Sequence, residues 1–249
     1  MSPSRAATAP RRPGAQKWVP DGAAARDVDA LAGAVQGCRG CELWADATQA
    51  VFSRGADDAP IVLVGEQPGD REDREGEPFV GPAGRVLADA IEAAGIDRER
   101  VYLTNAVKHF RFEQRGKRWL HKTPDVAHVR ACLPWLEAEV AAVRPRVVVA
   151  LGATAARAVL GRPARVTAER GRVLDPDDGS EESRRDGPQD GTQGSRGGTT
   201  GGSPLVVVTT HPSALLRLRD RSGWDEAFAA LAADLRVAAE AAGLGTRDA

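Results

Sequence analysis

The chain has 249 residues, 42% of them hydrophobic, which is enough to bury one core of good size. Its 34 Lys and Arg residues nearly balance 35 Asp and Glu residues, so any site for a polyanion must come from local clustering of charge. Three cysteines cannot complete a disulfide framework, no apolar secretory signal is present, and no apolar run reaches the roughly 18 residues of a membrane span. We therefore expect a cytoplasmic, monomeric protein with no membrane contact.

Both ends of the chain and one internal segment differ in composition from the rest. Residues 1–20 are rich in Ala, Pro and Arg without a helical period, which predicts a flexible leader. The segment 175–203 has no apolar side chain and cannot offset the entropy of ordering, so we expect a disordered insertion. One folded domain is therefore expected over residues 21–242, followed by a tail over 243–249.

A C-x-x-C pair, Cys38 and Cys41, lies near the start of this domain, and Cys132 lies far along the chain. The close spacing indicates a metal or cluster, and three thiolates need a fourth ligand, for which His109 is the candidate. Zinc bound by three cysteines and one histidine fits the count equally well. A redox-active cysteine pair and plain burial of Cys132 in the core are the alternatives.

Four short runs rich in β-branched residues predict buried strands at 61–69, 101–107, 146–153 and 204–213. They alternate with segments whose apolar residues repeat every three or four positions, which predicts helices over 83–94, 124–143, 153–160 and 224–242. The alternation indicates an α/β protein, a three-layer α/β/α sandwich with a central, mainly parallel four-stranded sheet. Ligands of such folds bind beyond the carboxyl ends of the strands.

The first predicted strand leads into the sequence GEQPGDRED at 65–73. It has neither G-x-G-x-x-G spacing nor a G-K-[ST] motif, so we expect no nucleotide cofactor. A tight glycine turn could present the Glu66 carboxylate and the Gln67 amide to a ligand. A purely structural turn between strand and helix is the alternative.

Two further side chains at strand ends suit a nucleobase. Phe79 lies in PFVGPAGR, where Pro and Gly predict a rigid turn that could offer an aromatic face for stacking. Asn105 ends the second predicted strand, and its amide could pair with both a carbonyl and an N–H of a pyrimidine. Ordinary packing of Phe79 and a turn-forming role for Asn105 are the alternatives.

The stretch GKRWLHKTP at 116–124 predicts a basic loop with His121 at its end, flanked by Lys117, Arg118 and Lys122. Between residues 108 and 122 there are six basic side chains and one acidic side chain, a local cluster that would suit a phosphate backbone. A solvated basic loop with an incidental histidine is the alternative.

The last predicted strand is followed by HPSALLRLR, which places apolar and basic side chains on one loop. Leu215 or Leu216 could wedge into a base stack while Arg217 and Arg219 contact phosphates, and Ser213 is a further candidate for DNA contact. His211 could donate to an anion that develops in a pocket. The alternative is a capping His-Pro turn.

Taken in order, GEQPG, PFVGPAGR, TNAVKHF, LGATAA and HPS resemble the iron–sulfur uracil-DNA glycosylases, family four of their superfamily, over residues 17–174 and 204–242. The GEQPG loop, the His after NAVK and the basic loop ending in His-Lys-Thr-Pro are similar to the UdgX branch, whose members become covalently trapped on uracil-DNA. That branch usually has KRRIH where this chain has KRWLH, so Trp119 replaces an arginine.

The resemblance implies an enzyme that removes uracil from DNA, preferably single-stranded. It implies a [4Fe-4S] cluster held by Cys38, Cys41, His109 and Cys132, with zinc as the lesser alternative. A turning-over hydrolytic glycosylase and a non-enzymatic cluster-containing nucleic-acid binder are the competing functions.

The resemblance also implies roles at the site. Phe79 would stack on uracil, and Asn105 would pair with its edge, while Gln67 positions the base and the loop. His211 would donate to the departing uracil anion. His121 would form the bond to C1′ of the sugar, with Glu66 orienting it or accepting its proton.

Overall fold

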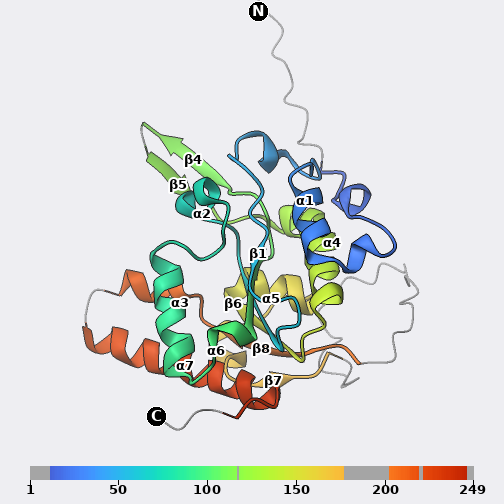
Figure 1. The fold of residues 1–249 in the computed structure, drawn as a ribbon. Helices are drawn as coiled ribbons and strands as arrows, with labels where there is room; N and C mark the ends of the chain where they lie inside the picture. The colour runs from blue at the N-terminus through green and yellow to red at the C-terminus, as the bar shows by residue number, and fades with distance from the viewer. Residues whose placement is uncertain (1–11, 117, 177–201, 219–220, 246–249) are drawn as a thin grey trace, which may run out of the picture.

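The protein is built around a six-stranded mixed sheet. The computed structural model describes residues 12–116, 118–176, 202–218 and 221–245, with the side chains of residues 118 and 221 excepted (Figure 1). The strand order is β1-β3-β2-β6-β8-β7, with bounds β1 Ser53–Arg54, β2 Ile61–Gly65, β3 Val101–Asn105, β6 Val147–Leu151, β7 Val173–Leu174 and β8 Leu205–Thr209. The predicted α/β sandwich with four parallel strands, β3, β2, β6 and β8, is confirmed.

The sheet is wider than predicted because β1 and β7 pair antiparallel at its two edges. Each of these strands has only two residues, too few to produce an alternating pattern in the sequence. The expectation of four strands is therefore corrected to six, while the central parallel arrangement is unchanged.

Helices cover both faces of the sheet, as the near-continuous apolar strands require. Ile61 and Leu63 of β2 face a core with α3 (Pro82–Ala93) and α7 (Arg221–Ala241). Val62 and Val64 face the opposite core with α1 (Val28–Val35), α4 (Val126–Val143) and α5 (Gly152–Leu160). Shorter elements complete the described chain: η1 Gln16–Trp18, η2 Ala24–Arg26, η3 Glu42–Ala45, α2 Asp70–Glu75, η4 Arg98–Arg100, α6 Val166–Glu169 and η6 Pro212–Arg217.

A separate two-stranded hairpin projects from the sandwich beside α2 (Figure 1). It consists of β4 (Phe112–Arg115) and β5 (Arg118–His121), with Phe112 paired to His121. The sequence had predicted a basic loop here, and the structure corrects this to a hairpin that places His121 at the end of a strand. The turn falls at Gly116, which has a φ of 61°.

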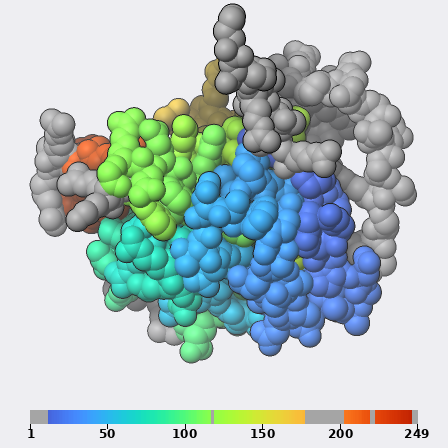
Figure 2. All heavy atoms as spheres, turned by 90° about the horizontal axis from the view of Figure 1, so that it is seen from above, coloured from blue at the N-terminus to red at the C-terminus, as the bar shows by residue number. Residues whose placement is uncertain are grey.

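The predicted leader over residues 1–20 is wrong for its second half. Arg12 Nη2 lies 2.7 Å from Glu42 Oε1, Arg12 Nη1 lies 3.0 Å from Asp125 Oδ1, and Ala15 is buried. Contacts with residues distant in sequence fix this segment, which composition alone does not reveal. Figure 2 shows the N-terminal part of the described chain (blue) in one continuous surface with the later segments coloured cyan and green.

Parts of the predicted leader, insertion and tail lie outside the described residues. Residues 1–11 of the leader, 177–201 of the insertion and 246–249 of the tail belong to this group. Within the described chain, no helix combines the length and apolar character needed to cross a membrane.

The turn before α3 depends on a glycine. Phe79 has a φ of 59°, and its carbonyl oxygen would lie 1.7 Å from a Cβ added at Gly84. Gly33, within α1, has open space where a Cβ would be.

We expect Gly84→Ala to lower the free energy of unfolding by about 1–3 kcal/mol, because the Phe79 turn would have to move. Gly33→Ala is the matched control and should raise it by roughly 0.5–1 kcal/mol through helix propensity. Urea unfolding of both variants provides the measurement. Equal stabilities for Gly84→Ala and wild type would contradict this account of the turn.

Candidate active site

The carboxyl ends of β2 and β3 form the floor of the site. Gly65 and Asn105, the last residues of these strands, are paired across the sheet. A Cβ at Gly65 would lie 2.3 Å from Asn105 Oδ1 and 2.7 Å from Phe79 Cζ. The absence of a side chain at Gly65 therefore lets the buried Asn105 amide and the Phe79 ring converge above the strand end.

His211, just beyond β8, forms one wall beside Phe79. Their rings are stacked at a centroid distance of 6.4 Å and an interplanar angle of 28°. The backbone N–H of Ser213 donates to His211 Nδ1 at 3.2 Å, and the Ser213 hydroxyl lies 2.9 Å from the same nitrogen. In the neutral ring, Nδ1 is thus the acceptor, and the proton is on Nε2.

His211 is neutral at physiological pH. Burial is the main cause that lowers its pKa to about 4, and the charges of His121 and Arg217 act in the same direction. A neutral imidazole with its proton on Nε2 can donate a hydrogen bond without carrying a formal charge.

Gln67 joins the loop after β2 to the base of the hairpin. Its Oε1 accepts from the Arg111 backbone N–H at 3.0 Å. Its Nε2 donates to the carbonyl oxygens of Arg111 at 3.1 Å and Lys122 at 3.2 Å. These main-chain partners determine which end of the Gln67 amide is the donor.

The orientation of Gln67 fixes the tautomer of His121. Gln67 Nε2 lies 3.0 Å from His121 Nε2 and shares its two hydrogens among this nitrogen and the carbonyl oxygens of Arg111 and Lys122. An amide nitrogen cannot accept a hydrogen bond, so this contact favours the tautomer in which the imidazole Nε2 accepts. His121 Nε2 therefore holds a lone pair, and the ring proton is on Nδ1. Burial is the main cause that lowers the His121 pKa, while the nearby Glu66 carboxylate opposes that change.

Glu66 lies between the hairpin and α5. Its Oε1 is 3.6 Å from His121 Nε2, and its Oε2 accepts a hydrogen bond from the Thr154 hydroxyl. Thr154 was not singled out in the sequence. Its position in the sequence could have indicated it, because Thr154 is a hydroxyl residue shortly after the third parallel strand and therefore lies at the same sheet edge as Glu66.

Trp119 is part of an aromatic stack on the inner face of the hairpin. Its ring is stacked on Phe112 at 4.5 Å and 6°, and the Arg74 guanidinium of α2 lies 5.6 Å from its centroid. Phe110 continues the stack, 5.2 Å from Phe112 and 6.0 Å from His121. Trp119 thus packs the hairpin against α2, and the resulting aromatic row ends at the His121 imidazole.

Part of the predicted basic cluster lies near the opening of the site. The Lys122 side chain is 55% exposed, and its Nζ is 4.0 Å from Glu113. The Arg111 side chain is 24% exposed and donates to the Thr123 carbonyl at 2.7 Å. Lys117 lies outside the described residues, and only the backbone of Arg118 is described, in β5.

The loop after His211 separates the two predicted wedge residues. Leu215 is 1% exposed and belongs to the core beneath α3, so the prediction that it could enter a base stack is wrong. Leu216 is 48% exposed and available. Arg217 is exposed and donates to the Ser213 hydroxyl at 3.2 Å, which places both residues beside His211.

The four candidate ligands, Cys38, Cys41, His109 and Cys132, are all buried. The Trp135 indole N–H donates to Cys38 Sγ at 3.3 Å, and the Lys108 backbone N–H donates to Cys132 Sγ at 3.3 Å. Burial raises the pKa of Cys41 to about 11 and that of Cys132 to about 12.

These donors suit thiolate ligands, which both an iron–sulfur cluster and a zinc ion require. N–H groups aimed at sulfur stabilise thiolate ligands of such clusters, and a bound cationic metal favours the deprotonated form of a buried thiol. A zinc site gathers its ligand atoms about 2.0–2.3 Å from one ion. In the described ranges, no three His, Cys, Asp or Glu side chains are grouped in a way that could hold one metal ion.

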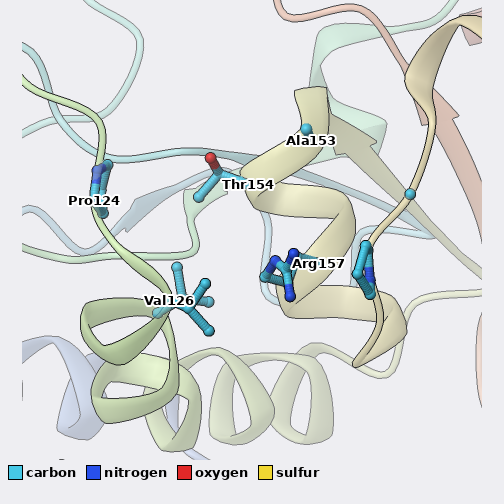
Figure 3. Close-up of a pocket in the computed structure, with 8 residues that line it drawn as sticks. Pro124, Val126, Ala153, Thr154 and Arg157 are labelled. Atoms are coloured by element: carbon cyan, nitrogen blue, oxygen red, sulfur yellow. The ribbon is translucent and has the colours of Figure 1, made fainter. Parts of the chain in front are cut away.

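A hollow of about 140 Å³ lies beside Glu66 and its partner Thr154, between the start of α4 and α5 (Figure 3). Thr154, the partner of Glu66, is on its wall, together with Arg157 and Val126. The Asn105 and Phe79 side chains are not among its lining residues.

Comparisons with known proteins point to one family. Residues 52–236 match the sequence profile of the Uracil DNA glycosylase superfamily. A type-4 uracil-DNA glycosylase of Thermotoga maritima is 34% identical over 186 residues, which cover 74% of this chain and 81% of that protein. That of Sulfurisphaera tokodaii is 39% identical over 116 residues, covering 46% of this chain and 50% of the relative. The protein of Saccharolobus solfataricus is 37% identical over 127 residues, covering 51% and 56%.

The low pKa of His211 predicts a pH dependence of stability. An unfolded histidine titrates near 6.5, whereas folded His211 titrates at about 4, so between these values the unfolded chain binds more protons. The contribution of His211 is therefore complete above pH 6.5 and decreases as the pH falls towards 4, by about 3 kcal/mol.

Unfolding of wild type and of His211→Asn, compared across this range, isolates the effect. The Asn oxygen can still accept from Ser213. The stability difference between the two proteins should fall with acidification, and a difference that stays constant would contradict a neutral His211 imidazole with a lowered pKa.

Proposed function

Because the chain belongs to the uracil DNA glycosylase superfamily, we propose that it cleaves the bond between uracil and deoxyribose in DNA. The observation that carries this proposal is the convergence of the Asn105 amide, the Phe79 ring and the His211 N–H above Gly65. The alignments with the S. tokodaii and S. solfataricus relatives span only about half of those proteins, so the activity of the whole chain is part of the proposal.

The pocket suits uracil by hydrogen bonding and by stacking. The Asn105 amide can accept from N3–H of uracil and donate to O4, whereas cytosine presents the opposite pattern at these positions. Phe79 offers one face of its ring to the base. A side chain at Gly65 would occupy the space between these groups.

Bond cleavage leaves the electron pair of the glycosidic bond on the base and a positive charge on the sugar. His211 Nε2–H can donate to the uracil anion as it forms, and as a neutral donor it keeps its proton. The Glu66 carboxylate, which accepts a hydrogen bond from Thr154, stabilises the sugar cation in this proposal. The base leaves as an anion and takes a proton from solvent.

We assign the capture of the sugar to His121. Its Nε2 lone pair forms the new bond to C1′, and the resulting imidazolium loses its Nδ1 proton to solvent, which leaves a neutral N-alkyl imidazole. Gln67 holds the imidazole in the required tautomer. An N-alkyl imidazole is a poor leaving group, so the product is a stable adduct and the protein turns over once.

Single-stranded DNA is the preferred substrate in this proposal. No base pair must be broken to bring the uracil into the pocket, which saves a few kcal/mol. Exposed Lys122 and Arg217 can contact phosphates on either side of the extruded nucleotide, while exposed Leu216 can fill the gap it leaves. Lys117, Arg118 and Ser213 complete the proposed contacts.

We further propose that Cys38, Cys41, His109 and Cys132 hold a [4Fe-4S] cluster. When bound, the cluster links three distant parts of the chain and supplies stability. The two N–H···S hydrogen bonds and the burial of all four side chains support this assignment.

The competing function is a glycosylase that turns over, in which Glu66 orients water and His121 contacts only phosphate. The observation in its favour is the 48% exposure of the His121 side chain, which leaves room for solvent. The two functions differ in what bonds to C1′ of the sugar: the His121 imidazole in the first and water in the second.

We expect wild type to form a heat-stable band of reduced mobility with a uracil-containing single strand on a denaturing gel. A thymine strand should give none. His121→Ser should abolish the band and leave base release to water. Leu120→Ser is the matched control, because Leu120 is the adjacent residue of β5 and is already 39% exposed.

Two outcomes would overturn these assignments. Free abasic strand in several-fold excess over protein, without a shifted band, supports the hydrolytic alternative. Equal affinity for uracil and thymine strands with no base release would instead support a non-enzymatic binder.

For the cluster, we expect about four iron and four sulfide per chain in anaerobically purified protein, with broad visible absorbance. Cys132→Ala should lose both, and lose thermal stability with them. His109→Cys should retain both, because thiolate is the usual ligand of such clusters. One zinc and no sulfide would contradict the proposal.

A further inference from the structure

Lys108 has an unusual environment for a cation. Its side chain and that of Glu139 are both 0% exposed, and the two form an ion pair. Lys108 belongs to the segment between β3 and the hairpin, whereas Glu139 belongs to α4. A buried ion pair therefore joins the segment that follows β3, the strand that ends at Asn105, to helix α4 on one face of the sheet.

Each donor position of the Lys108 ammonium is occupied. Besides Glu139, it donates to the Thr104 hydroxyl at 2.6 Å and to the main-chain carbonyl of Asn105 at 2.9 Å. An ammonium group has three N–H donors, and three acceptors use them all. The position of the Asn105 main chain is thereby tied to Lys108.

The main chain of Lys108 is held by the same helix. Its N–H donates to Cys132 Sγ at 3.3 Å, and Cys132 precedes Glu139 by two turns of α4, so both lie on one face. Lys108 therefore contacts α4 at two points and Asn105 at a third.

Stability alone does not account for this arrangement. Replacing a buried ion pair by uncharged groups of similar volume is often neutral or stabilising, whereas removing one partner is costly. A buried charged pair does hold its members in one geometry, because moving either group away would leave an unpaired charge in the core, which is strongly unfavourable. The group held here is the residue proposed to recognise the base.

We propose that Lys108 is a positioning residue for uracil recognition, which fixes the Asn105 amide relative to α4 and its cluster ligand Cys132. This inference rests on the proposed function of Asn105 in binding uracil. Loss of the Lys108 contact should misplace the amide by a fraction of an ångström while leaving the fold intact.

The test uses Lys108→Met together with Glu139→Gln, which removes both charges and keeps an acceptor for the Tyr102 and Thr104 hydroxyls. We expect a folded protein with its visible absorbance retained, and a single-turnover rate of uracil release at saturating DNA reduced about 10- to 100-fold. Binding of a strand with a cleavage-resistant 2′-fluorinated deoxyuridine should lose its preference over a thymine strand.

Tyr102→Phe is the matched control. It removes the hydrogen bond that the Tyr102 hydroxyl donates to Glu139 at 3.2 Å but leaves the contact between Lys108 and Asn105. It should lower the free energy of unfolding by about 1 kcal/mol and leave both rate and base preference unchanged.

A double variant with wild-type rate and base preference would overturn the proposal. If it does not fold, the same measurements are made on Lys108→Gln with Glu139→Gln, and failure of both pairs to fold would also overturn it, since the network would then serve the fold alone. If wild type neither releases uracil nor forms an adduct, the proposed function fails, yet the binding comparison still tests whether Lys108 positions Asn105.

Discussion

The register of the parallel sheet determines where the chemistry can occur. Gly65 is paired with Asn105, and Leu151 is paired with Thr209, so the four parallel strands end at one edge. Glu66, Thr154 and His211 follow three of those strand ends, and each therefore reaches the same space from a different loop. A shift of one strand by one residue would turn its side chains to the other face and remove its terminal group from the site.

His121 is the exception, because it reaches the site from outside the sheet. It lies on a hairpin whose own strands make no pairs with the central strands. Gln67 compensates by binding main-chain atoms on both sides of the hairpin base, and Trp119 packs the inner face against α2. The imidazole is thus placed by side-chain contacts, whereas Asn105 is placed by the pairing of β3 with β2, to which Lys108 adds a contact with its main-chain carbonyl.

This difference explains how much could be predicted from the sequence. The parallel strands, their order of appearance and the polar groups at their ends follow from local pattern, since a buried strand and its terminal residue are adjacent in the chain. The ordering of residues 12–20 by Glu42 and Asp125, the burial of Leu215 and the hydrogen bond from Thr154 to Glu66 depend on residues distant in sequence. The hairpin was missed because each of its strands has only four residues, too few for the mixed polar and aromatic side chains to show an alternating pattern.

The proposed choice between trapping and turnover depends on one nitrogen. His121 Nε2 lies between a donor, Gln67, and a carboxylate, Glu66. In the proposed mechanism the donor keeps a lone pair on that nitrogen and partial burial lowers the pKa of the ring, so that the imidazole takes the place of the water that a hydrolytic enzyme would use. A water molecule oriented by Glu66 has to compete with a nitrogen that is already held in position, and capture by a group fixed in the site has the entropic advantage. In this proposal the adduct is irreversible because the bond between His121 Nε2 and C1′ is hard to hydrolyse, and no further feature of the fold is needed.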